Sequence, residues 1–235
     1  TLGGGNILQV RMKPLDEAEK LRLTDAIKTK FGAEVVERQF TTVGPAIGRE
    51  VTQAAVLAVI AASLAIMGFL IVAFRKVPHP FRYGASAVIA MIHDVLVTIG
   101  IFSILSLILG WQADALFLTA VLTVIGFSVQ DTIVVFDRIR ENTPKYRGES
   151  YTQIADRSLT ETLHRSLATQ LNAIFILVAI LFFGGVTIRQ FIATLLVGLL
   201  SGTYSSIFTA VPLLVVWEKG EIGSSIRRLF GRASA

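Results

Sequence analysis

The sequence predicts an all-α, polytopic membrane helix bundle preceded by a small α+β domain. Hydrophobic residues make up 53% of the 235 residues and charged residues only 17%, whereas a soluble domain has about 25% charged residues. The mean hydropathy is +0.65, and the apolar residues gather in five long runs. Runs of about 20 apolar residues are typical of membrane-spanning helices, because lipid cannot satisfy the polar backbone of an irregular segment.

Residues 1–53 are of mixed polarity and predict the small domain. Residues 7–12 alternate like a strand, residues 16–31 have the spacing of an amphipathic helix that Gly32 ends, and residues 34–40 predict a second strand. A β-α-β unit of this size buries little core by itself. We therefore expect it to pack on something else.

The hydrophobic runs predict five spans at 54–74, 83–109, 115–136, 165–183 and 191–217. The fourth run is the shortest, and we expect its helix to begin earlier, near Ser158. Gly198 and Gly202 form a pattern of small residues four apart that favours close helix packing, and Pro212 predicts a kink. Residues 54–217 are thus the predicted bundle, and residues 218–235 a basic tail.

Basic residues predict the orientation of the bundle and explain the net charge of +5, so nucleic acid is not a predicted partner. They follow the first, third and fifth spans: Arg75, Lys76, Arg82; Arg138, Arg140, Lys145, Arg147, Arg157; Lys219, Arg227, Arg228, Arg232. The positive-inside rule places these segments and the C-terminus in the cytoplasm, and the N-terminal domain in the periplasm or outside. Because five spans with an external N-terminus insert awkwardly, we expect a sixth spanning helix before Thr1.

Asp131, in the third span, is the clearest candidate for a functional residue, because an ionisable side chain inside a membrane is costly. Arg165 in the next, antiparallel span is predicted at a similar depth. Arg165 belongs to a stripe of polar residues at helical spacing on this span: Ser158, Glu161, Thr162, Arg165, Thr169 and Asn172. Two interpretations stay open. The stripe holds helices together, or Asp131 and Arg165 form a proton relay, since burial favours a neutral carboxyl and a guanidinium favours an ionised one.

Further candidates for relay or cavity-lining residues are His93, Asp94, Glu161, Thr162 and Thr169. His93 and Asp94, in the middle of the second span, are either a packing pair or members of the relay. Glu161 is four residues before Arg165 and is an alternative partner for it. No metal site and no cofactor are predicted, because the three histidines have no ligand spacing.

Residues 124–142 carry a family resemblance. Their sequence, VIGFSVQDTIVVFDRIREN, is similar to the signature G-Y-S-x-N-D-T-x-V-V-F-D-R-x-R-E of the SecF branch of the SecD/SecF protein-export family, within the RND superfamily. Further matches are residues 43–45, 93–94, 162–165, 169 and 182–185, so the resemblance covers nearly the whole chain. The departures are Phe127 for the usual Tyr, Gln130 for Asn, and Glu161 for an amide.

The resemblance implies a six-helix, RND-like bundle with a small α+β periplasmic domain, in a bacterial inner membrane. It implies a non-enzymatic auxiliary translocase subunit that uses the proton motive force to promote export of preproteins, with Asp131 as the protonatable residue and Arg165 as its partner. The implied partners are SecD, the SecYEG channel, YajC, YidC, the translocating preprotein and protons. The alternatives are an RND-type exporter of small molecules or lipids, and a scaffold of the channel that conducts no protons.

Overall fold

The computed structural model describes residues 17–31 and 45–220, and among them every regular element is a helix. The chain divides into two units, residues 1–52 and 53–235, and each is described by itself. In the first unit, α1 (Glu17–Phe31) confirms the helix predicted at 16–31. The strands predicted at 7–12 and 34–40 lie outside the described residues, so the α+β character of this domain stays a prediction.

The described part of the chain holds five helices that are long and apolar enough to cross a membrane, which confirms the five predicted spans. They are α2 (Pro45–Ala73), α3 (Pro80–Leu109), α4 (Ala115–Asn142), α5 (Tyr151–Phe183), and the helical run that begins with α6 (Val186–Ser205). Several helices extend beyond the apolar runs predicted for them, because polar turns continue them, and the early start expected for the helix of the fourth span is confirmed. α4 continues to Asn142, and α5 begins at Tyr151 with a capping box of Ser150 and Gln153.

The fifth span is interrupted near its C-terminal end. A π-helical turn, η1 (Ser206–Ala210), separates α6 from α7 (Val211–Glu218). Pro212 lies in the first turn of α7. Proline has no N–H to donate and its ring crowds the preceding turn, and single π turns are a common adjustment inside helices. The helix is thus interrupted by a π turn just before the proline, and the kink predicted at Pro212 stays a prediction.

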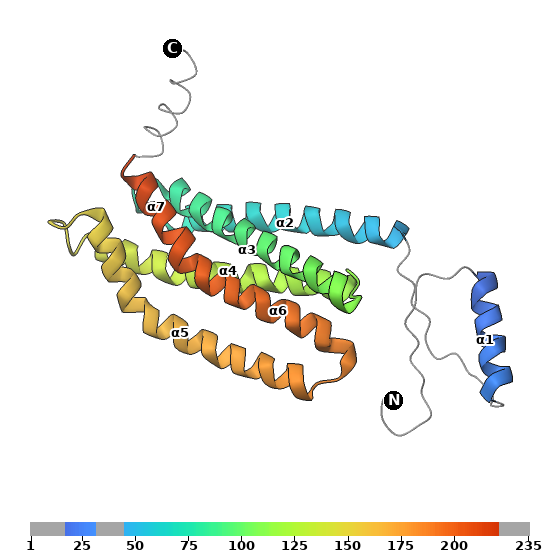
Figure 1. The fold of residues 1–235 in the computed structure, drawn as a ribbon. Helices are drawn as coiled ribbons and strands as arrows, with labels where there is room; N and C mark the ends of the chain where they lie inside the picture. Colours follow the sequence, from blue (N-terminus) through green and yellow to red (C-terminus); the bar gives the residue numbers. More distant parts are fainter. Residues whose placement is uncertain (1–16, 32–44, 221–235) are drawn as a thin grey trace, which may run out of the picture. The chain divides into compact units, whose positions relative to one another are not determined.

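The bundle is arranged around α4 and α6, which lie side by side (Figure 1). A side chain at Gly198 would collide with Val124 of α4, and a Cβ at Gly202 would lie 3.1 Å from the Cα of Ser128. These two glycines allow the close helix contact that their spacing predicted. In contrast, Leu70 is the only buried side chain in the described part of α2. Leu107 and Phe183 are 88% and 91% exposed, which suits surfaces that face lipid.

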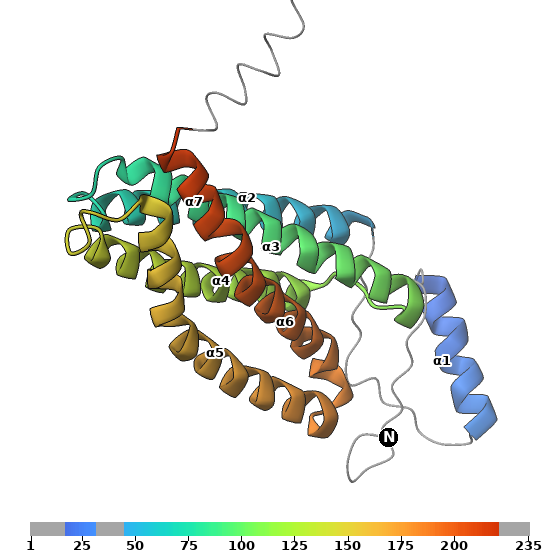
Figure 2. The ribbon, with the colours of Figure 1, turned by 60° about the vertical axis from the view of Figure 1, so that its left-hand side comes forward.

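The connections alternate between two ends of the bundle (Figures 1 and 2). The segments 74–79 and 143–150 lie at the same end as α7, and the segments 110–114 and 184–185 lie at the opposite end. Helix caps define the second end: Gly110 ends α3 with φ of 67°, which glycine adopts easily, and Asp114 accepts a hydrogen bond from the N–H of Phe117 to begin α4.

Candidate functional site

Asp131 is a buried carboxylate on α4, and its residue is only 5% exposed. Its hydrogen-bond partner is Gln170 on α5, whose Nε2 donates to Asp131 Oδ2. Gln170 is also 5% exposed. Among the residues that the structure describes, no cation forms an ion pair with Asp131. The carboxylate therefore lies in a membrane-spanning helix with a neutral amide as its partner.

Three side-chain hydrogen bonds set the register of α4 against α5: Asn142 with Ser158 at 3.0 Å, Arg138 with Glu161 at 2.6 Å, and Asp131 with Gln170. The two helices are antiparallel, since the partner residue number rises on α5 as it falls on α4. By this register Arg165 lies at the level of Val135. It is displaced from Asp131 by about one helical turn, or about 6 Å along the axis.

The predicted contact between Asp131 and Arg165 is therefore not formed in this structure. Arg165 is exposed on α5, and it makes no ion pair within the described ranges 17–31 and 45–220. The sequence-based estimate of depth placed Arg165 near a helix end. Because α5 begins at Tyr151, Arg165 instead lies in the fifteenth position of a 33-residue helix.

The buried polar face of α5 differs from the predicted stripe. It consists of residues at steps of four: Ser158, Thr162, Ser166 and Gln170. Thr162 Oγ1 donates to the carbonyl of Ser158 at 2.9 Å. The prediction that Thr169 shares this face was wrong: Thr169 is exposed, and its hydroxyl donates to the carbonyl of Arg165 at 3.0 Å.

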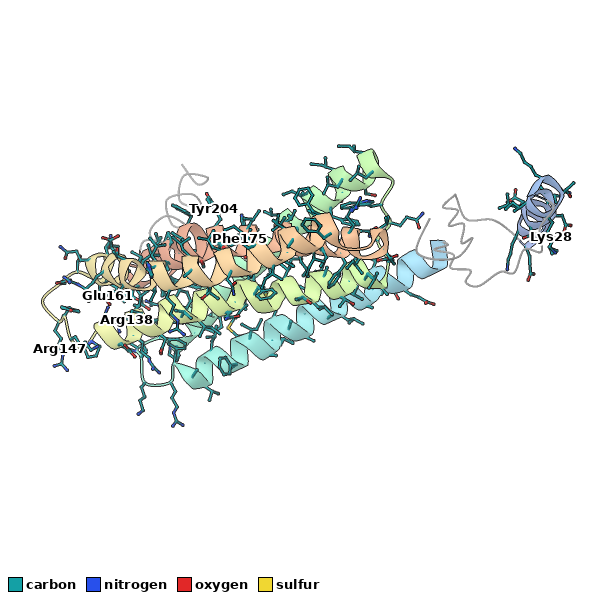
Figure 3. All side chains as sticks on the ribbon, turned by 90° about the horizontal axis from the view of Figure 1, so that it is seen from below. Lys28, Arg138, Arg147, Glu161, Phe175 and Tyr204 are labelled. Atoms are coloured by element: carbon teal, nitrogen blue, oxygen red, sulfur yellow. The ribbon has the colours of Figure 1, made fainter. Side chains whose placement is uncertain are left out.

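Glu161 links α5 to α4 rather than to Arg165. Its Oε2 accepts from Arg138 Nε at 2.6 Å and from Asn142 Nδ2 at 2.9 Å. Figure 3 shows Arg138 and Glu161 close together, near the end of the bundle where Arg147 lies. The alternative of an intrahelical pair with Arg165 is thus wrong, and Glu161 instead connects α5 to α4 through these two hydrogen bonds.

Asp94 on α3 is a second buried carboxylate, with no exposed surface. It accepts hydrogen bonds from four side chains: Ser201 at 2.7 Å and His93 at 3.1 Å on Oδ1, and Ser128 and Ser205 at 2.5 Å on Oδ2. These donors come from α3, α4 and α6, so Asp94 joins three helices. Its two oxygens have two partners each, which favours a structural role for the predicted His93–Asp94 pair.

Sequence reasoning missed Gln170 and the three serines. Gln170 continues a row of small polar residues at steps of four on α5, and Ser201 and Ser205 are four apart in an apolar helix. Such i, i+4 polar rows are the signal that could have found them. Among the described residues, no group of three or more His, Asp or Glu side chains could hold a metal ion.

The chain is similar to known protein-export membrane proteins over most of its length. The family described as protein export membrane protein SecD/SecF, C-terminal, matches residues 23–220. Protein translocase subunit SecF of Thermobaculum terrenum is 54% identical over 92% of this chain and 68% of its own length, and that of Anaerolinea thermophila is 50% identical over 100% and 77%. A crystal structure of SecDF in a super-membrane-facing form matches 92% of this chain and 28% of its own, with a TM-score of 0.66 and 27% identity. The chain therefore belongs to the SecD/SecF family of protein-export membrane proteins.

Proposed function

We propose that this chain is the SecF subunit of a protein translocase, and that it uses the proton motive force to promote export of preproteins across the bacterial cytoplasmic membrane. The names of its relatives support the first part of the proposal. The observation that carries the second part is Asp131, a carboxylate buried inside a spanning helix with a neutral hydrogen-bond partner. Such a residue can change its protonation state at less cost than one that is held by a fixed cation.

The distribution of basic residues supports a membrane orientation for this role. Arg75 and Lys76 lie in the segment 74–79, and Lys145 and Arg147 lie in the segment 143–150, at the end of the bundle that α7 shares. The opposite segments, 110–114 and 184–185, contain no Lys or Arg. By the positive-inside rule, the first end and the C-terminus face the cytoplasm, and the domain at residues 1–53 faces the periplasm or the exterior.

The register of α4 and α5 suggests how a proton could be coupled to movement. With Asp131 neutral, the amide of Gln170 is a sufficient partner. An ionised Asp131 is better stabilised by Arg165, which lies about one turn away along α5. A displacement of α5 by about 6 Å would bring the guanidinium to the carboxylate. We therefore retain Asp131 and Arg165 as the relay, with proton release drawing Arg165 toward Asp131 and proton uptake letting it move away.

SecD is the first partner in this proposal, because the matched crystal structure is of SecDF and this chain covers 28% of it. The SecYEG channel and a translocating preprotein follow from the role of a translocase subunit. YajC and YidC stay predictions from the sequence resemblance. The proposed role is mechanical, with no bond made or broken by the subunit.

The test is preprotein translocation into vesicles that hold SecYEG, SecD and the full-length protein, with and without a proton gradient. We expect Asp131→Asn to lose the stimulation by the gradient while the ATP-driven translocation without a gradient is unchanged. The matched control is Asp137→Asn on the same helix, because Asp137 is half-exposed and pairs with Arg140. If Asp131→Asn responds to the gradient as the wild type does, the subunit is a scaffold and the relay is wrong.

A further inference from the structure

The hydrogen bond to Asp131 uses only one end of the Gln170 amide. Nε2 donates to Asp131 Oδ2, whereas Oε1 is buried and has no hydrogen-bond partner among the described residues. The whole residue is 5% exposed. Buried polar atoms without partners are rare, and each one needs a physical explanation.

The two ends of an amide match the two protonation states of a carboxyl group. An ionised carboxylate can only accept, so it needs the NH2 end, whereas a protonated carboxyl also donates and matches the carbonyl end. A half-turn about the last side-chain bond of glutamine exchanges these ends and leaves the shape of the side chain unchanged. Among the side chains of similar length, lysine and arginine only donate, and an ionised glutamate only accepts.

We propose that Gln170 is a positioning residue that stabilises either protonation state of Asp131 by turning its side-chain amide, so that the unpartnered oxygen becomes the acceptor when Asp131 is protonated. This inference rests on the proposed function, because it requires Asp131 to exchange a proton. It differs from the relay by assigning the local response to a neutral residue that no charge argument singles out.

Ser166 supplies a second observation on the same face of α5. It lies one turn before Gln170 and is 9% exposed, and its Oγ also has no hydrogen-bond partner in the described part of the chain. A hydroxyl both donates and accepts, so it is compatible with either end of the amide. Two unpartnered polar atoms on consecutive turns indicate a site that is built for rearrangement rather than for one fixed set of bonds.

Other ionisable groups near this level have their own partners or are displaced. Within about two turns, the described elements packed around Asp131 contribute the following: His93 and Asp94 on α3; Asp137 and Arg138 on α4; His164 and Arg165 on α5. Asp94 is bonded to His93 and three serines, Asp137 pairs with Arg140, and Arg138 pairs with Glu161. His164 and Arg165 are exposed.

The experiment is infrared difference spectroscopy of the full-length protein in vesicles, recorded while the pH is varied over the range in which the protein stays folded. We expect a carboxyl band that Asp131→Asn removes, and an amide band that titrates with it. Gln170→Leu and Gln170→Met should both remove the amide band and lower gradient-stimulated translocation about tenfold or more, since a buried hydrogen bond is lost. Two variants are used so that a folding defect in one leaves the other informative.

Gln190→Leu is the matched control. Gln190 is a buried glutamine on α6, and its amide donates to the carbonyl of Gln112 at 2.5 Å, away from Asp131. It should keep both titrating bands. A carboxyl band that titrates with no accompanying amide band would leave the proposed function intact and overturn the amide switch. If no band of Asp131 titrates at all, the proposed function and the switch are both wrong.

Discussion

Asp94 and Asp131 are both carboxylates inside membrane-spanning helices, but their surroundings differ. Asp94 accepts four hydrogen bonds from three helices, and none of its surface is exposed. Asp131 has the amide of Gln170 as its partner, and that amide carries an unpartnered oxygen. Protonation of Asp94 would therefore disturb four hydrogen bonds, whereas protonation of Asp131 would disturb one.

This difference follows from how closely the helices approach one another. Gly198 and Gly202 bring α6 against α4, so that Ser201 and Ser205 of α6 and Ser128 of α4 reach the same carboxylate. α5 contains no glycine, and none of its residues after Gln170 is buried. Close packing thus fixes the bonds of Asp94, whereas the looser contact of α5 leaves room for the bonds of Asp131 to change.

The largest expected effect is on stability when Asp94 is removed. Asp94→Ala leaves the buried hydroxyls of Ser128, Ser201 and Ser205 without their acceptor, so we expect the free energy of unfolding to fall by roughly 2–4 kcal/mol. The measurement is denaturant-induced unfolding in detergent micelles or bicelles. A loss below about 1 kcal/mol would show that the serines find other acceptors and that the contrast with Asp131 is not energetic.

Some features of these two carboxylates and their helices could be predicted from the sequence. The number of spans follows from hydropathy, because the membrane thickness sets the length of each run. Asp131 and the His93–Asp94 pair stand out because charge is rare in such runs. The polar row on α5 could have marked Gln170 as a buried residue. Its pairing with Asp131 could not be predicted, because the register of α4 and α5 is set by Asn142, Arg138 and Glu161 in polar turns beyond the apolar runs.

The second prediction tests whether close packing creates the Asp94 cluster. A side chain at Gly198 would overlap Val124, so Gly198→Val should push α6 from α4 and lower the free energy of unfolding by about 2 kcal/mol. The control is Gly126→Val on α4, where an added Cβ meets no atom within 4 Å. If both variants unfold alike, the glycine contact is not what holds the serines at Asp94.

The third prediction concerns how much one hydrogen bond to Asp94 contributes to stability. Ser205→Ala removes one donor at 2.5 Å while Asp94 keeps its other partners, so we expect a loss of about 1 kcal/mol. Ser103→Ala on α3 is a control, because its exposed hydroxyl bonds to the carbonyl of Ile99 within its own helix. Equal losses in the two variants would mean that the bond to the carboxylate has no special weight.

The smallest expected change in stability is at Asp131, and it is the most informative about function. Asp131→Asn keeps the size of the side chain, and its amide can still hydrogen-bond to the amide of Gln170. We expect the free energy of unfolding to change by less than about 0.5 kcal/mol in the same unfolding assay. A loss as large as that of Asp94→Ala would make Asp131 another structural anion. An unchanged free energy of unfolding, combined with lost stimulation by the gradient, would show that Asp94 stabilises the bundle whereas Asp131 couples the gradient to translocation.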